Sequence, residues 1–378
     1  AILAKPTDRG WNAHGFDDGK KIAQLDEKMR RKMEAYCPPK PPPPNLDLVI
    51  VGAGIAGLVV AGEYIKAGGE QIGILERANR FGGVWMDHSN PFSRSQTVEP
   101  AYRLPIQSRQ PGPIHQTYAH ELMNDLATHV KEHGLMDKIH TKFTVRSVSK
   151  ATRSADGKPS YIVCGYQDGQ RHLVSCRQIA ICVNRRLSGT PNQLKMAGEE
   201  RFIGAIRRGL RNDVSDVDFT RKKVLILGMG AFAIENMRNS LEHGAAHTRI
   251  LCRRRGTVCP KPIDWVNYVR PRNTGVDRRS GDTRSWNCWV DCYKKTGAQT
   301  PEIWKEGKIK PDGHGLSVAD LYFVAYHLKM AETRLGQVDH LEPKGCVNTN
   351  GNEFLEADIL IPAIGFRENP ASEGAQTR

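Results

Sequence analysis

Three glycines at fixed spacing, Gly52, Gly54 and Gly57, carry the clearest chemical signal in the sequence. They follow the apolar run from Leu48 to Val51 and precede a stretch with helical periodicity. In such a strand–turn–helix unit the first glycine makes the tight turn, the second lets a pyrophosphate approach the backbone, and the third allows close helix packing. The helix N-terminus adds unpaired N–H groups and a positive dipole. The pattern predicts a dinucleotide site.

An acidic residue ends the next apolar strand. Glu76 stands 24 residues after Gly52, directly after the run Ile72 to Leu75. A carboxylate at this point accepts hydrogen bonds from a ribose 2′-hydroxyl. The acidic strand end favours a dinucleotide site over a glycine-rich turn in another kind of α/β protein.

A second glycine-rich turn follows in the other half of the chain. Gly228, Gly230 and Ala233 come after the apolar run Val224 to Leu227 and open a predicted helix that continues to about His243. The alanine in the third position permits slightly wider helix–strand packing. We therefore expect a second dinucleotide site here.

The strand after this second turn ends in positive charge. Thr248 to Cys252 is followed by Arg253, Arg254 and Arg255, the first of which lies 25 residues after Gly228. Guanidinium groups pair with a 2′-phosphate, which a carboxylate would repel. The position favours NADP(H) binding over a basic surface run, with Arg253 and Arg254 as the expected ligands.

Two adjacent glycines, Gly82 and Gly83, follow Glu76 at short range and are themselves followed by Trp85. They suggest a second approach of backbone to the first ligand. The whole arrangement resembles the class B flavin monooxygenases, which use FAD and NADPH and include the flavin-containing and Baeyer–Villiger monooxygenases. The resemblance implies that FAD binds the first site, with Gly82 and Gly83 near its pyrophosphate, Trp85 near its isoalloxazine and Val145 beside its adenine.

Two later segments extend the resemblance. Phe202 and Gly204 match a fingerprint of the family, with Arg208 in the position of a histidine thought to couple the two nucleotide domains. The run 357–366, which contains Gly365, is similar to a strand of the family that returns the chain to the FAD domain. The resemblance thus assigns Arg208 to catalysis and Gly365 to cofactor binding.

The loop after Trp85 resembles two branches of the family. Pro91 and Arg94 keep the spacing of the Baeyer–Villiger pattern, but Gln96 replaces the aspartate that helps position a catalytic arginine. Asn90 resembles an asparagine of the heteroatom-oxidising branch that lies near the flavin. Its alternative role is that of a turn-forming Asn-Pro pair. Both branches stay open, with Asn90 and Arg94 as candidate catalytic residues.

The two distant glycine-rich units and the resemblance predict an α/β fold with two Rossmann-like, doubly wound dinucleotide-binding domains. We expect the NADP domain to be inserted into a discontinuous FAD domain. Residues 1–45 are expected to be an N-terminal extension with a solvated charged helix and a Pro-rich linker. Residues 46–190 would form the first part of the FAD domain, 191–340 the NADP domain with a helical insertion, and 341–378 a return segment of the FAD domain, ending early for the family.

Opposite charges at the two strand ends indicate hydride transfer from NADPH to FAD. By resemblance, the reduced flavin then reacts with O2 through a flavin hydroperoxide and oxygenates a soft nucleophile, an amine or a sulfide. A Baeyer–Villiger or other FAD/NADPH oxidoreductase, or a nucleotide-binding pseudoenzyme or fragment, are the alternatives. A disulfide reductase is disfavoured because the sequence has no CxxC pair.

The composition of the chain argues against several other classes of function. The net charge is +14, but the basic residues are spread without interleaved aromatic platforms, so we do not expect nucleic-acid binding. Nine cysteines form no zinc pattern. The sequence has no apolar segment of about 18 residues and no hydrophobic signal core. We expect a cytoplasmic enzyme of small-molecule substrates without membrane association, and a homo-oligomer stays open.

Overall fold

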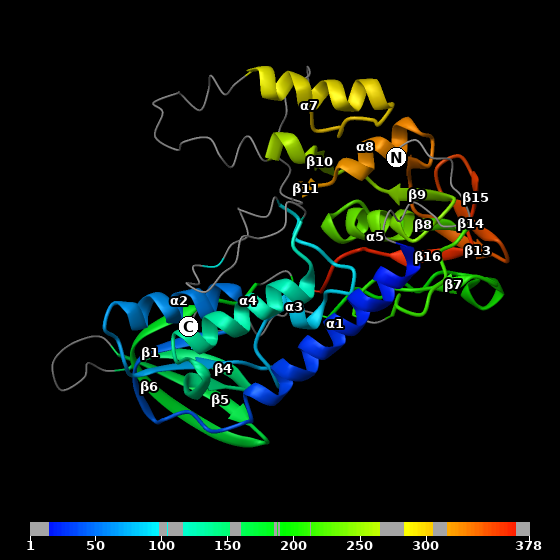
Figure 1. Cartoon of the computed structure of the whole chain (residues 1–378). Helices are drawn as coiled ribbons and strands as arrows, with labels where there is room; N and C mark the ends of the chain where they lie inside the picture. Colours follow the sequence, from blue (N-terminus) through cyan, green and yellow to red (C-terminus); the bar gives the residue numbers. More distant parts are fainter. Residues whose placement is uncertain are drawn as a thin grey trace.

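The computed structural model describes residues 15–97, 104, 116–151, 160–184, 187, 190–211, 213–264, 283–304 and 316–367. Two β-sheets with their helices form two units that follow one another along the chain (Figure 1). Within the described residues, no helix has the length and apolarity needed to cross a membrane.

The first sheet has the strand order β3-β2-β1-β6-β5-β4. Its central strand β1 pairs in parallel with β2 and β6, while β5 pairs antiparallel with both β4 and β6. The turn between β5 and β6 places Asp168 and Gly169 at positive φ, which is typical of a tight hairpin. The bounds are β1 Asn45–Val51, β2 Ile72–Leu75, β3 Ile139–His140, β4 Phe143–Ala151, β5 Ser160–Gln167 and β6 Gln170–Ile181.

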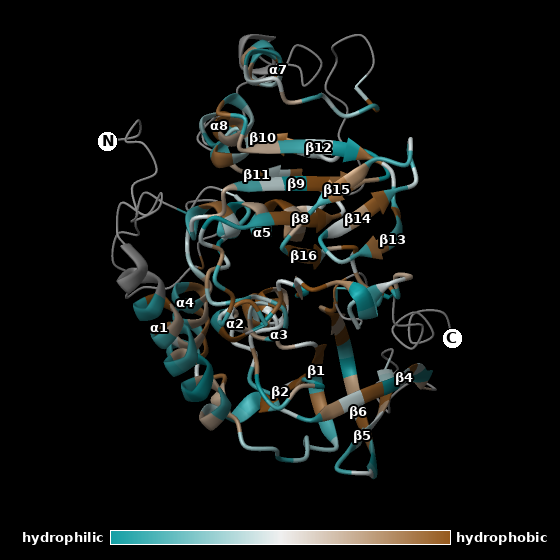
Figure 2. Cartoon of the chain, turned by 90° about the vertical axis from the view of Figure 1, so that its right-hand side faces the viewer, coloured by the Kyte–Doolittle hydropathy of each residue, from teal (hydrophilic) through white to brown (hydrophobic). Residues whose placement is uncertain are grey.

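Three helices lie between the first sheet and the second unit in both views (Figures 1 and 2). They are α2 Ile55–Lys66, α3 Val84–Asp87 and α4 Ala119–Glu132, and a short 3₁₀ turn, η2 Met136–Lys138, follows α4. Leu48 and Ile50 of β1 and Leu58 of α2 are buried in one hydrophobic core. Burial of this apolar strand on both faces fits a central strand of a parallel sheet.

The second sheet, of order β12-β9-β8-β16-β7, is parallel throughout. It comprises β7 Ala205–Ile206, β8 Lys223–Leu227, β9 His247–Cys252, β12 Ala331–Leu335 and β16 Ile359–Pro362. Helices α5 Ala231–Glu242, α7 Thr283–Thr296 and α8 Asp320–His327 and the parallel pair β10 Thr257–Cys259 and β11 Leu316–Val318 accompany it, after the 3₁₀ turn η3 Glu199–Arg201. Trp289, Tyr293 and Trp304 pack in its main core.

The two sheets share one plan, since β1 lies between β2 and β6 as β8 lies between β9 and β16. The prediction of two Rossmann-like units is confirmed. The prediction that residues 341–378 return to the first domain is wrong for their described part. Strand β16 pairs with β8, and Asp358 fixes its start there: the Asp358 N–H donates to the Lys223 carbonyl and the Asp358 carboxylate accepts from the Lys223 N–H, both at 2.8 Å.

An antiparallel sheet precedes β16 and belongs to the second unit as well. It has the order β13-β14-β15, with bounds β13 Val338–Glu342, β14 Gly345–Asn348 and β15 Phe354–Glu356. Leu341 and Leu355 share a buried cluster with Leu225 of β8. Asn350 and Gly351 lie in the turn between the antiparallel strands β14 and β15, and Gly351 has positive φ.

The N-terminal helix is part of the first unit. Helix α1, Gly15–Tyr36, runs along α4, and its Met29 and Met33 are buried in the first core together with Cys37. The Pro-rich segment after it contacts the sheet, because the Pro44 carbonyl accepts a hydrogen bond from the Ser175 N–H at 2.8 Å. The expectation of a solvated extension is therefore wrong: Met29 and Met33 have the i, i+4 spacing of a buried helix face, but the charged residues around them favoured a solvated helix.

Candidate functional site

The first glycine turn lies where β1 meets α2, and each glycine has a distinct steric reason. Gly52 has φ +100°, and a Cβ there would lie 2.8 Å from the Cys182 carbonyl oxygen. A Cβ on Gly57 would lie 1.9 Å from the Gly52 carbonyl oxygen. Gly54 precedes α2, and no side chain caps the helix there. The first-turn N–H groups of α2 thus face a surface without side chains, which fits a pyrophosphate.

The second pair of glycines lies against this turn. The Gly82 N–H donates to the Ala53 carbonyl at 2.9 Å, and a Cβ on Gly83 would lie 3.0 Å from the Gly54 Cα. Gly82 and Gly83 both have positive φ. Trp85 follows on α3 and is buried. Two glycine loops from different parts of the sequence therefore form one cradle, in which their backbones lie against each other because neither Gly54 nor Gly83 has a Cβ.

Glu76 lies beside the cradle, at the end of β2. One carboxylate oxygen accepts the Ala53 N–H and the other the Ala78 N–H, both at 2.8 Å. Burial of this carboxyl group raises the pKa of Glu76, and the two backbone donors oppose that shift. The Phe143 N–H donates to the Glu76 carbonyl at 2.8 Å, which brings the start of β4 and hence half-buried Val145 to the same end of the site.

The second glycine turn repeats the geometry of the first. Gly228 has φ +98°, and a Cβ there would lie 2.6 Å from the Ala363 carbonyl oxygen. Gly230 precedes α5, no side chain caps this helix, and a Cβ on Gly230 would meet nothing within 4 Å. Ala233 is fully buried at the third position. The space over the α5 N-terminus thus fits a second pyrophosphate.

Gly365 belongs to this second turn rather than to the first. It has φ +85°, and its carbonyl accepts the Asn192 N–H at 2.9 Å, just after β16. The expected place of Gly365 in the FAD domain is therefore wrong. In the first unit the Cys182 carbonyl lies beneath Gly52 as the Ala363 carbonyl lies beneath Gly228, so Asn184 is the residue equivalent to Gly365.

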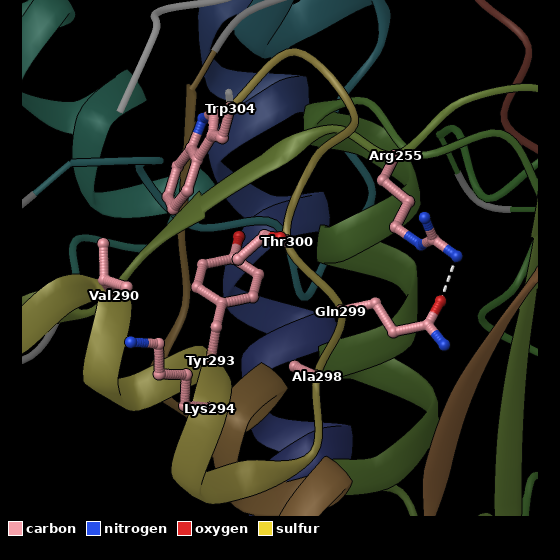
Figure 3. Close-up of a pocket in the computed structure, with 8 residues that line it drawn as sticks. All are labelled: Arg255, Val290, Tyr293, Lys294, Ala298, Gln299, Thr300 and Trp304. Carbon is pink, nitrogen blue, oxygen red and sulfur yellow. Dashed lines mark hydrogen bonds between the residues drawn. The ribbon is translucent and has the colours of Figure 1, made fainter. Parts of the chain in front are cut away.

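The arginine run divides into two parts at the end of β9. Arg253 and Arg254 are exposed. Arg255 pairs with Glu302 at 2.5 Å and donates to the Gln299 side chain, and it lines a cavity of about 540 Å³ beside α7 (Figure 3). Since Glu302 engages Arg255, the predicted contact to a 2′-phosphate stays with Arg253 and Arg254.

Asn90 is fully buried and joins the two units. Its amide nitrogen donates to the Gly209 carbonyl at 3.0 Å, while its amide oxygen accepts the Phe92 N–H at 2.9 Å and the Asn239 side chain at 3.3 Å. These contacts connect the loop after α3 with α5 and with the segment before β8. They describe a structural residue, and the geometry lends no support to the catalytic role predicted for Asn90.

Arg94 is held in a similar way. It pairs with Glu242 of α5 at 3.0 Å, donates to the Tyr118 hydroxyl at 2.5 Å, and lies 4.4 Å from the centre of the Tyr118 ring. The guanidinium therefore bridges α4 and α5. This arrangement accounts for Arg94 without a catalytic role.

The residue in the fingerprint position, Arg208, has an exposed side chain. Its N–H donates to the Asp213 carboxylate at 2.6 Å. The position lies one residue before Gly209, whose carbonyl accepts from Asn90, so Arg208 stands next to the contact between the units. Its proposed role in coupling them stays a prediction.

Three polar residues of α5 contact the first unit and were not predicted from the sequence. Glu235 accepts the Ser93 hydroxyl at 2.7 Å, and Arg238 donates to the Phe92 carbonyl at 3.1 Å and to Asn239 at 3.0 Å. All three are buried against the loop of the first unit, and burial raises the pKa of Glu235. Their spacing of i, i+3 and i+4 places them on one face of the helix, which was the available signal.

Comparison with known proteins supports this description. A family model described as an NAD(P)-binding Rossmann-like domain matches residues 50–106. A probable FAD-binding monooxygenase, AlmA, of Acinetobacter sp is 25% identical over 350 residues, which cover 85% of this chain and 69% of that protein. The FAD-containing monooxygenase EthA of Mycobacterium tuberculosis (strain ATCC 25618 / H37Rv) is 26% identical over 351 residues, with 85% and 70% covered.

The chain resembles the FAD-containing monooxygenases. This similarity confirms the resemblance drawn from the glycine motifs. Two solved structures share the fold of this chain. An oxidized steroid monooxygenase bound to NADP has a TM-score of 0.63 at 19% identity, with 88% of this chain and 73% of that chain covered. An open crystal structure of cyclohexanone monooxygenase has a TM-score of 0.60 at 15% identity, with 87% and 75% covered.

Proposed function

We propose that the protein is an FAD- and NADPH-dependent monooxygenase that transfers one oxygen atom from O2 to a soft nucleophile, an amine or a sulfide. One observation carries the proposal. The two glycine turns have the same geometry, but the strands that follow them end in opposite charges: Glu76 in the first unit, and Arg253 with Arg254 in the second. In a chain related to FAD-containing monooxygenases, this difference assigns FAD to the first site and NADPH to the second.

In this proposal the residues of the protein bind the two cofactors and orient them. The Gly54–Gly83 cradle and the N-terminus of α2 bind the FAD pyrophosphate, and Glu76 accepts hydrogen bonds from the ribose. The N-terminus of α5 binds the NADPH pyrophosphate beside Gly230, and Arg253 and Arg254 select the 2′-phosphate. Bound FAD and NADPH supply the redox and oxygen chemistry.

The contact between the units sets the relative position of the two sites. Asn90, Ser93 and Arg94 follow the flavin cradle in sequence, and their partners lie on α5, which begins at the NADPH turn. A buried polar contact of this kind holds a defined geometry because each unpaired group would carry a desolvation cost. We infer that this contact keeps nicotinamide and flavin in register for hydride transfer.

Ketone oxygenation is the second candidate, since Pro91 and Arg94 keep the Baeyer–Villiger spacing. It ranks second because Gln96 stands in the position of the positioning aspartate and Arg94 is paired with Glu242. The proposal also includes a cytoplasmic location, and a small-molecule substrate with O2 as partners.

Isotope labelling tests the proposed reaction. The protein is incubated with FAD, NADPH and ¹⁸O₂ and either an aryl methyl sulfide, a tertiary amine or a cyclic ketone. The proposal predicts a sulfoxide or an amine oxide that contains one ¹⁸O atom and forms only with NADPH. A labelled lactone from the ketone alone would favour the second candidate. Consumption of NADPH without any labelled product would contradict both.

A further inference from the structure

One face of α1 packs against the loop that contains the second pair of glycines. Arg30, Met33 and Glu34 lie at i, i+3 and i+4, so they share one side of the helix. Met33 is fully buried, and its terminal methyl carbon would be 3.2 Å from a Cβ on Gly82. Glu34 pairs with Arg80, just before the glycines. The helix thus supports the loop from behind.

Arg30 makes the most specific of these contacts. Its guanidinium donates to the Met86 carbonyl at 2.6 Å, to the Ser89 carbonyl at 3.1 Å and to the Ser89 hydroxyl at 2.8 Å. The Ser89 hydroxyl in turn donates to the Trp85 carbonyl. These carbonyls lie in and just after α3, where a helix end leaves acceptors without partners. Arg30 supplies the missing donors.

Asp26 holds the guanidinium in this orientation. It accepts from Arg30 Nε at 2.6 Å, and its side chain is 1% exposed against 14% for Arg30. A planar guanidinium with five donors in a fixed fork serves four acceptors at once, namely Asp26, two carbonyls and the Ser89 hydroxyl, whereas an ammonium group has three donors and no fork. The pair is therefore a fixed bracket between α1 and the segment from Trp85 to Ser89.

We propose that Arg30 is a positioning residue of the flavin site: by fixing the Trp85–Ser89 segment, it sets the place of Gly83 and Trp85 relative to the bound FAD. The inference rests on the proposed function, because it takes FAD as the ligand of the first cradle. It gives α1 an indirect part in cofactor binding, through carbonyls in and just after α3.

The same helix offers a matched control. Arg31 pairs with Glu27 at the same i, i+4 spacing, but both side chains are largely exposed, 76% and 56%. Arg31→Gln removes one charge and one ion pair from α1, as Arg30→Gln does, without touching the loop. An exposed pair contributes only about 0–1 kcal/mol. A difference between the two variants therefore reports the contact with the loop.

The test measures the FAD dissociation constant of the whole chain by fluorescence titration and the visible circular dichroism of the bound flavin. For Arg30→Gln we expect at least ~10-fold weaker FAD binding, a difference of about 1.4 kcal/mol, and an altered flavin dichroism. Arg31→Gln should match the wild type in both. Arg30→Lys keeps the charge, so it guards against a folding failure, and should still show altered dichroism because it loses the fork.

Two results would overturn the inference, and they differ. If Arg30→Gln or Arg30→Lys binds FAD with wild-type affinity and dichroism, α1 has only a structural role and the proposed function is unaffected. If the wild-type chain itself binds no FAD, the proposed function fails and the role of Arg30 fails with it.

Discussion

Gly54 and Gly230 occupy equivalent places in the two units. Each precedes the helix of its glycine turn, with extended backbone and no capping side chain. Any residue can adopt the backbone conformation of these two glycines, and a Cβ at either position would have room in the protein without cofactor. The fold alone does not require a glycine at these two residues, and in the proposed function the bound cofactors do.

This difference predicts separate effects for neighbouring glycines. Gly54→Ala should leave thermal unfolding of the protein without cofactor unchanged and weaken FAD binding by at least ~10-fold, about 1.4 kcal/mol. Gly57→Ala should instead lower the unfolding temperature, because its Cβ would lie 1.9 Å from the Gly52 carbonyl oxygen. Gly230→Ala should fold and bind FAD normally but bind NADPH weakly. Normal FAD binding by Gly54→Ala would contradict the assignment of the cradle.

The arginine run makes a prediction about cofactor choice. Replacing both Arg253 and Arg254 with alanine should lower kcat/KM for NADPH by at least ~10-fold and change that for NADH little, since the lost interaction is a charge-assisted hydrogen bond worth about 1.5–3 kcal/mol. Steady-state oxidation of the two cofactors measures it. Arg207→Ala, which removes a side chain paired with Asp216 elsewhere in the unit, is the control. Equal losses for NADH and NADPH would show that the run does not bind the 2′-phosphate.

The fixed spacing of the glycines allowed most of the geometry of the two turns to be predicted from the sequence. Gly52, Gly57 and Gly228 are each required by a close backbone contact, and such requirements leave a strict sequence pattern. The roles of Asn90 and Arg94 could not be predicted in the same way. Their partners Asn239 and Glu242 are about 150 positions away, and no local pattern connects them.

At the scale of elements, α5 links both halves of the molecule. Its N-terminus forms the second glycine turn, and its polar face, with Glu235, Arg238 and Asn239, packs against the loop after α3. The helix thus connects the place where NADPH is proposed to bind with the segment that follows the flavin cradle.

Substitution of Asn90 distinguishes a structural role of this residue from a catalytic one. Asn90→Ala would remove the hydrogen bond that the Phe92 N–H donates and one of the two that the Gly209 carbonyl accepts, so the free energy of unfolding without cofactor should fall by about 1–3 kcal/mol. Denaturant titration measures this. Thr128→Ala, at a partly exposed helix position of the first unit, should change it little. An Asn90→Ala protein of normal stability that has lost only activity would restore the catalytic role.

The sequence predicted which helices and strands exist better than it predicted where they lie in the fold. The apolar run of β16 is buried in either unit, so its sequence did not distinguish the first sheet from the second, and the Asp358–Lys223 contact decides between them. Helix α1 illustrates the opposite case: Met29, Met33 and Cys37 recur every four positions, as on one face of a helix, but the many charged residues between them favoured a solvated helix, and the three side chains complete the first core.

At the scale of the whole molecule, buried histidines predict sensitivity to acid. Burial lowers the pKa of five histidines from the ordinary value of 6.5, namely His88, His129, His140, His243 and His247. A lowered pKa in the folded state means that the stability these groups contribute is present above pH 6.5 and is lost as the pH falls below it, because the unfolded chain binds protons first.

The unfolding temperature of the protein without cofactor should therefore fall as the pH is lowered from about 7.5 to about 5.5. Glu76 and Glu235 act in the opposite sense, because burial raises their pKa and protonation then favours the folded protein. Thermal unfolding across this range measures the balance. An unfolding temperature that rises on acidification would show that the two carboxyl groups outweigh the histidines.

The most direct test of two communicating dinucleotide sites is anaerobic. Protein loaded with FAD is mixed with NADPH without O2, and the visible absorbance of the flavin is followed in time. If the two units are held as described, NADPH bleaches the flavin, and it does so far more slowly in Gly230→Ala. A flavin that stays bound and oxidised in the presence of saturating NADPH would contradict hydride transfer between the two sites.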